Sequence, residues 1–344
     1  MKLIFCISNL SVPVTISLVE NENEDFVIFT DQLNLVIFFS KLYGNDRVIF
    51  CENFKIKGKI QHLLFFPFLI LFKHNLWKKF QNYSGCKVYF FFNAFGFKES
   101  WLIKKLSKKN LIFYQPDIDM SSFTQILNVK SIIGMLMIFC NYNVITEPKY
   151  SNTNIYYSVS KKFIHQTKTE LIDIKINKEA IKRTISQHFD VSKRKIIYLI
   201  GDVVESKYID EKEYILKNDL LLAKFNKDET ILKIHPRYTK IYSKENEFGM
   251  LPSYIPANVL IEHFEIVIAY SSSVLFEFAN NGITAISLLN YFEPTSQSIK
   301  SDFIQYLKHN TVEERMIYYP KNTDEIYGII NSETKQIDHV SNKA

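Results

Sequence analysis

The sequence predicts an α/β protein with two parallel sheets, each flanked by helices. Short apolar or β-branched runs alternate with longer segments of helical spacing in both halves of the chain, which is typical of strand–helix–strand units. A charged stretch at residues 165–195 separates the halves, and 344 residues are enough for about two domains. We therefore expect two Rossmann-like domains, at residues 1–165 and 190–335, facing across a cleft.

The first domain is expected to begin with a strand at residues 3–7. This apolar start differs from a signal peptide because it runs into Ser8 without a small-residue cleavage site. Similar runs and the helical segments between them predict strands at residues 26–30, 47–51, 87–92, 111–114 and 144–146, and helices at 33–43 and 99–107.

The second domain is expected to open on the apolar, β-branched run at residues 195–200, which Gly201 follows. Asn281 and Gly282 should end a helix, because Gly readily adopts the left-handed conformation that closes helices. The remaining pattern predicts strands at residues 230–234, 267–269 and 284–288, and helices at 211–223, 274–280, 302–307 and 323–331.

Charge and cysteine content restrict the class of protein. The 42 basic and 36 acidic residues give a formal charge of +6, which suits an anionic substrate or an acidic membrane surface. This excess is too small for a nucleic-acid footprint, so we expect no nucleic-acid partner. The cysteines lie far apart and form no CxxC pair, which favours reduced, buried thiols in a cytoplasmic protein: Cys6, Cys51, Cys86 and Cys140.

The longest apolar run, residues 63–72, is too short to span a membrane, because a spanning helix needs about 20 residues. It predicts a buried helix or strand pair, or a helix that contacts a membrane surface. Basic and aromatic residues at 73–79 follow it and could dock a lipid-linked acceptor. Peripheral binding to the inner membrane therefore stays open.

Two short motifs in the second half are the best candidates for a site. Residues 231–237 and 267–279 each read as a buried strand that runs out into polar residues, and the second then enters a helix. In open parallel sheets, ligands bind beyond the carboxyl ends of strands. A phosphate is the ligand that such His-, Arg- and Ser-bearing strand ends would hold, which indicates a nucleotide-activated donor.

The first motif places His235 at a strand tip. Pro236 keeps the residue before it extended, which fixes His235 in place. The imidazole can donate to a phosphate oxygen or give a proton to a leaving group. Arg237 offers a second anion contact. The alternative is a surface histidine beside a turn proline, with a solvated arginine.

The second motif carries Ser271, Ser272 and Ser273 before a helix. Serine is a preferred N-cap, so a capped helix alone would explain it. Free amide groups at a helix start and serine hydroxyls also bind anions. With His235 about one strand–helix unit upstream, we interpret the serines as phosphate-binding.

Two further segments have structural and functional readings. Ile255 and Pro256 lie in a stretch that is either a helix start or a loop reading a nucleotide base, with Glu262 near the ribose. Asp117 and Asp119 follow a predicted strand and either cap a helix or accept a proton from an acceptor hydroxyl. A single DxD is a weak metal signal.

Several common enzyme motifs are missing from the sequence. There is no GxGxxG, GxxxxGK[ST], HExxH or GxSxG. NAD enzymes, P-loop ATPases, zincins and α/β-hydrolases are therefore disfavoured.

Residues 233–237, 254–257 and 268–277 occur in the order and spacing of bacterial sialyltransferases. The chain resembles glycosyltransferase family 52, the lipooligosaccharide sialyltransferases, which are related to capsular polysialyltransferases. The strong part of the resemblance covers about residues 195–290. It implies a GT-B fold, a CMP-activated sialic acid donor, inversion at the anomeric carbon, and no metal or other cofactor.

The resemblance also implies roles for individual residues. His235 would contact the CMP phosphate and aid its departure, and Ser271, Ser272 and Ser273 would include the phosphate-binding hydroxyls. Ile255 and Pro256 would border the cytidine. The remaining residues expected in the donor site are Gly201, Pro236 and Arg237.

The chain departs from the family at two positions. The family's acidic pair is followed by Gly, whereas residues 116–120 here contain Asp117 and Asp119 without one, so either could be the base. Asn258 stands where an acid is expected, so a related nonulosonic acid or a Kdo-like sugar is an open donor. Two alternatives also stay open: a GT-B transferase for another nucleotide sugar, and a non-catalytic nucleotide or glycan binder.

The expected partners are CMP-sialic acid and a galactose-terminated or sialylated glycan, such as lipooligosaccharide or capsule. A homodimer stays open.

Overall fold

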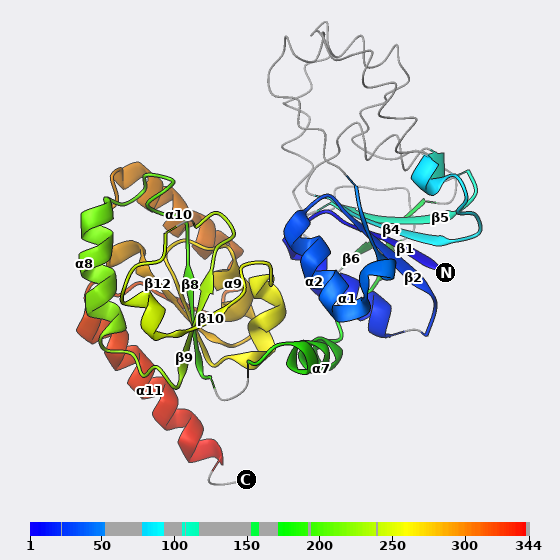
Figure 1. The fold of residues 1–344 in the computed structure, drawn as a ribbon. Helices are drawn as coiled ribbons and strands as arrows, with labels where there is room; N and C mark the ends of the chain where they lie inside the picture. The colour runs from blue at the N-terminus through cyan, green and yellow to red at the C-terminus, as the bar shows by residue number, and fades with distance from the viewer. Residues whose placement is uncertain are drawn as a thin grey trace, which may run out of the picture. The chain divides into compact units, whose positions relative to one another are not determined.

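The computed structural model describes residues 1–21, 23–51, 78–92, 105–106, 108–116, 153–157, 171–191, 194–238 and 240–341. The chain divides into two compact units, residues 1–181 and 182–344. Each unit contains one sheet (Figure 1). The predicted boundaries at residues 165 and 190 remain predictions.

The N-terminal unit contains a seven-stranded sheet in which all neighbouring strands are parallel, in the order β3-β2-β1-β4-β5-β6-β7. Its strands are β1 (Lys2–Cys6), β2 (Phe26–Thr30), β3 (Val48–Phe50), β4 (Lys87–Phe92), β5 (Leu111–Pro116), β6 (Thr153–Tyr157) and β7 (Leu171–Asp173). Its described helices are η1 (Asn9–Ser11), α1 (Val12–Glu20), α2 (Leu33–Tyr43), η2 (Asn45–Arg47) and α7 (Lys178–His188), which crosses the division between the units.

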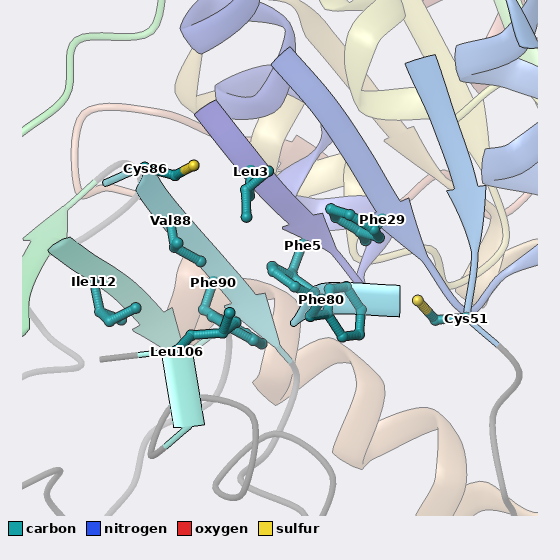
Figure 2. Packing of buried hydrophobic residues seen from close by; sticks show 10 residues of the cluster. All are labelled: Leu3, Phe5, Phe29, Cys51, Phe80, Cys86, Val88, Phe90, Leu106 and Ile112. Carbon is teal, nitrogen blue, oxygen red and sulfur yellow. The ribbon is translucent and has the colours of Figure 1, made fainter. Parts of the chain in front are cut away.

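Aromatic side chains form the core on one face of this sheet. Phe5 of β1 lies in register with Phe29 of β2 and Phe90 of β4, so the three rings form one row across adjacent strands. The ring centroids are 4.8 Å apart for Phe5 and Phe29 and 4.1 Å apart for Phe5 and Phe90. Phe80 covers the row (Figure 2). The phenylalanine-rich sequence therefore builds its core by in-register stacking on a parallel sheet.

The C-terminal unit contains a six-stranded parallel sheet in the order β10-β9-β8-β11-β12-β13. Its strands are β8 (Ile196–Ile200), β9 (Thr230–Ile234), β10 (Gly249–Leu251), β11 (Ile266–Ala269), β12 (Thr284–Ser287) and β13 (Ile317–Tyr318). Its helices are α8 (Glu211–Leu222), η5 (Glu245–Glu247), η6 (Ala257–His263), α9 (Val274–Asn280), η7 (Leu288–Asn290), α10 (Gln297–Asn310) and α11 (Thr323–Ser341).

The strand order of this sheet contains a topological switch. The chain runs outward from β8 through β9 to β10, then returns to the other side of β8 and continues through β11, β12 and β13. α9 packs on β11, β12 and η6. Lys224, just after α8, and Asp324 in the first turn of α11 form an ion pair with Nζ and Oδ1 3.6 Å apart. The α/β fold class with two Rossmann-like domains is therefore confirmed.

Most predicted elements match the structure within a few residues, and α1 was not predicted. β10 and β13 were not predicted, because three and two residues are too few to show an apolar run. The helix predicted at residues 302–307 is longer, since polar residues continue α10 in both directions. β6 and β7 were also missed. The strand predicted at 144–146 and most of the helix at 99–107 lie outside the described residues.

Cys6, Cys51 and Cys86 are buried, whereas Cys140 lies outside the described residues. The apolar run at 63–72 and most of the basic stretch at 73–79 also lie outside them. Within the part of the chain that the structure describes, no helix is both long and apolar enough to cross a bilayer.

Candidate functional site

Three of the predicted donor residues follow three neighbouring strands of the C-terminal sheet. β8 pairs with β9 as far as Ile200 opposite Ile234, and with β11 as far as Leu199 opposite Ala269. Continued past these pairs, the same register puts Gly201 opposite His235, one step beyond the last β8–β9 pair, and opposite Ser271, two steps beyond the last β8–β11 pair. The three residues therefore leave the sheet at one carboxyl edge. This edge at β8 and β11 is the switch point, where doubly wound sheets bind ligands.

Backbone hydrogen bonds hold His235 at the end of β9. Its amide donates to the Ile200 carbonyl at 2.9 Å, which extends the ladder with β8 by one residue. Its carbonyl accepts from the Tyr238 amide at 2.9 Å and closes a turn around Pro236 and Arg237. The predicted fixing of His235 at a strand tip is therefore what the structure shows, and both the ladder and the turn contribute.

The same turn determines the tautomer of the His235 imidazole. The Arg237 amide donates to His235 Nδ1 at 3.2 Å, so Nδ1 is an acceptor and the proton of the neutral ring is on Nε2. Burial lowers the pKa of His235, and the positive charges of Arg237 and Lys233 add to this effect. Asp202 opposes it. His235 is therefore suited to donate a hydrogen bond from Nε2 as a neutral ring.

Asp202 is a site residue to which the sequence analysis assigned no role. Its carboxylate lies 3.1 Å from Arg237 Nε and 3.8 Å from His235 Nδ1, and it accepts from Ser206 Oγ at 3.1 Å. The Asp202 side chain is 17 % exposed, whereas that of Arg237 is 74 % exposed. The signal in the sequence was the acid directly after Gly201 at a predicted strand end, where the carboxyl edge gathers functional groups.

The three serines lie between β11 and α9. Ser272 Oγ accepts from the Val274 amide at 3.3 Å and so performs the capping role. Ser273 occupies the N-cap position without a side-chain capping bond. The Ser271 and Ser273 hydroxyls make no hydrogen bond to the described part of the chain. Capping alone therefore explains one serine, and the half-buried hydroxyls of Ser271 and Ser273 are available to a ligand.

Ile255 and Pro256 follow β10, beside the His235 strand. The Ile255 side chain is buried, its amide donates to the Pro252 carbonyl at 3.2 Å, and Pro256 precedes the 3-10 helix η6. Buried Lys233 of β9 donates to the Ser253 carbonyl at 3.1 Å and to its neighbour's carbonyl at 2.9 Å. Burial lowers the pKa of Lys233 to about 8. This lysine ties the loop before Ile255 to the end of β9.

The remaining predicted site residues are Gly201, Asp117 and Asp119. A Cβ atom at Gly201 would lie 3.5 Å from Val203 Cγ1, an ordinary contact, so sterics within the chain do not require glycine there. Asp117 and Asp119 lie outside the described residues, directly after β5, which ends at Pro116. Among the described residues, no group of three His, Cys, Asp or Glu side chains is placed to hold a metal ion.

Comparison with known proteins supports the fold alone. No protein-family model and no curated protein sequence matches the chain. The structure is similar to the H444N variant of the wall teichoic acid polymerase TagF, with a TM-score of 0.50 and 11 % identity over 97 % of this chain and 80 % of that one. This likeness shows a shared two-domain α/β fold, of the class called GT-B.

Two further solved structures are similar at lower scores. The glycotransferase of kitacinnamycin has a TM-score of 0.49 and 6 % identity, over 96 % of this chain and 90 % of that one. The Escherichia coli heptosyltransferase WaaC has a TM-score of 0.42 and 12 % identity, over 96 % and 99 % of the two chains. Neither score is high enough to carry an argument about this chain.

Proposed function

We propose that the chain is an inverting glycosyltransferase that moves sialic acid, or a related nonulosonic acid, from a CMP-activated donor to a cell-surface glycan. The observation that supports this most directly is that His235, Gly201 and Ser271 follow three neighbouring strands at the switch point of the C-terminal sheet. The His235 imidazole, which accepts from the Arg237 amide, and the Ser271 and Ser273 hydroxyls, which bond to no described residue, all follow strand ends at this edge. Such groups suit the phosphodiester of a CMP-sugar and the CMP that leaves.

The chemistry of the transfer matches this set of groups. The bond between the anomeric carbon and the phosphate oxygen breaks with its electron pair going to CMP, so negative charge grows on the phosphate. Hydrogen bonds from His235 Nε2 and the hydroxyls of Ser271 and Ser273 would strengthen as that charge grows, which is how a fixed donor lowers a barrier. The acceptor hydroxyl forms the new bond on the opposite face.

The acceptor proton needs a base, and Asp117 or Asp119 is proposed for that role because both follow the carboxyl end of β5. The proposal includes transfer without a metal, so a chelator should leave the rate unchanged. It also includes a cytoplasmic protein that meets a lipid-linked acceptor, such as lipooligosaccharide or capsule, at the inner membrane.

The first test is transfer from CMP-N-acetylneuraminic acid to a galactose-terminated acceptor, with release of CMP as the readout. Wild type should transfer. The rate of the single variant His235→Ala should fall about 10²–10⁴-fold, and so should the rate of one of the two single variants Asp117→Asn and Asp119→Asn. Absence of release, with CMP still raising the melting temperature, would favour another CMP-sugar or a binding-only protein. Absence of both release and stabilisation would reject a CMP donor.

A second test separates hydrogen bonding from proton transfer at His235. Glutamine can place an amide N–H near the imidazole Nε2 position, whereas the shorter asparagine side chain reaches only the Nδ1 position. If neutral Nε2–H donation is the role, His235→Gln should retain clearly more activity than His235→Asn. Equal loss in both variants would instead indicate that His235 gives up its proton to the leaving group.

A further inference from the structure

A buried carboxylate lies close behind the His235 turn. Glu245 is 0 % exposed and accepts hydrogen bonds on both carboxylate oxygens. The Tyr242 amide donates at 3.0 Å, Asn218 Nδ2 at 2.9 Å, the Tyr214 hydroxyl at 3.1 Å, and the Tyr238 hydroxyl at 3.0 and 3.1 Å to the two oxygens. No cation of the described residues contacts it, so hydrogen bonds alone hold this buried acid.

The donors to Glu245 come from two parts of the domain. Tyr214 and Asn218 lie on α8. The side-chain Oδ1 of Asn218 accepts from the Tyr198 hydroxyl of β8 at 2.9 Å, which fixes the orientation of the side-chain amide. Tyr238 and Tyr242 lie on the segment that follows His235. Glu245 therefore fastens the segment after β9 to the helix after β8.

We infer that Glu245 is a positioning residue for His235: by fixing Tyr238 it holds the turn whose Arg237 amide selects the Nε2–H form of the imidazole. The inference deepens the proposed function, and it rests on that function only for the role of the Nε2–H tautomer in transfer. Tyr238 is the direct link, because its side chain binds Glu245 while its amide binds the His235 carbonyl.

The effect is geometric and does not act through the charge of Glu245. The charged groups that shift the pKa of His235 are Asp202, Arg237, Lys233 and Glu205, and Glu245 is not among them. A change in the network should therefore reach the imidazole only by loosening the turn, and the 3.2 Å bond from the Arg237 amide to Nδ1 is the contact that would weaken.

A matched pair of variants tests this route. Tyr214→Phe and Tyr238→Phe each remove a buried phenol that donates to Glu245, but Tyr214 approaches from α8 and Tyr238 from the His235 turn. The readout is the tautomer of His235 in the full chain without ligand, from the ¹⁵N shifts of labelled histidine. The His235→Gln spectrum assigns the signal among the eight histidines.

Wild type and Tyr214→Phe should show one tautomer, with the proton on Nε2, and Tyr238→Phe should show a mixture. In the transfer assay, Tyr238→Phe should lose about 10-fold or more in kcat with little change in KM, because small misplacements of a reacting group are costly. Tyr214→Phe should stay within about 2-fold. A single unchanged tautomer in Tyr238→Phe, or equal mixtures in both variants, would overturn the inference.

The tautomer measurement does not depend on the donor. If wild type transfers nothing and binds no CMP, the proposed function fails while the tautomer comparison still decides the role of Glu245. If Tyr238→Phe does not fold, Glu245→Gln replaces it. The new side-chain amide then points an N–H at the Tyr242 amide or at the tyrosine hydroxyls, which weakens the network. The His235 signal should again show a mixture of the two tautomers. An unmixed signal in a folded Glu245→Gln protein would reject the role.

Discussion

His263 should make the protein sensitive to mild acid. It is the last residue of η6, two residues short of β11, and its Nε2 atom is buried with no hydrogen-bond partner in the described residues. Burial lowers its pKa from 6.5 to about 4, the positive charge of Lys182 adds to this effect, and Glu262 opposes it. The folded protein therefore keeps His263 neutral where an unfolded chain would protonate it.

The sign and size of the effect follow from these two pKa values. Because the pKa is lowered in the folded state, the stabilising contribution is complete above pH 6.5 and is lost as the pH falls towards 4. Each pH unit in that window costs about 1.4 kcal/mol, and the whole window about 3.4 kcal/mol. His263 is partly exposed, so screening by water reduces the expected loss to about 1–2 kcal/mol.

The assay is urea unfolding by circular dichroism at pH 7.5, 6.0, 5.0 and 4.5. Carboxylates contribute equally to wild type and variant, so the difference between the two proteins isolates His263. His263→Leu, which needs no proton and no partner, should lose about 1–2 kcal/mol less than wild type between pH 7.5 and 4.5. His309→Leu, at the exposed end of α10, is the control and should follow wild type. Parallel curves for wild type and His263→Leu would refute the reasoning.

Three other outcomes are expected. Phe90→Ala should cost about 3–5 kcal/mol in urea unfolding, because it empties one position of a fully buried aromatic row; a loss under about 1 kcal/mol would contradict the packing. Gly282→Ala should cost about 1–2 kcal/mol, because φ is +83° there and the new Cβ would lie 3.4 Å from Arg315; no loss would mean that the turn relaxes. Asp202→Asn should lower the pKa of His235 in an NMR titration, since Asp202 raises it; an unchanged pKa would show that Arg237 moves to compensate.

Much of the fold was predictable because parallel sheets leave a strong local signal. Buried strands on both faces read as continuous apolar runs, and β8, β9 and β11 were found within one or two residues for that reason. Asn281 and Gly282 ended α9 as expected, with Gly282 at positive φ. β10 and β13 were missed because they are edge-side strands of three and two residues, whose pairing depends on neighbours distant in sequence.

The sequence by itself determined which residue types end the strands: His235, Gly201 and Ser271 were named from local pattern alone. Only the tertiary structure decided that they follow neighbouring strands at one edge, because the order β9-β8-β11 and its register come from pairing between distant segments. The same is true of Asp202 beside Arg237, and of Glu245 beneath the turn. Those side chains carry no periodic signal, and their partners are set by chain crossings, so their roles appear only when the sheet and its helices are packed together.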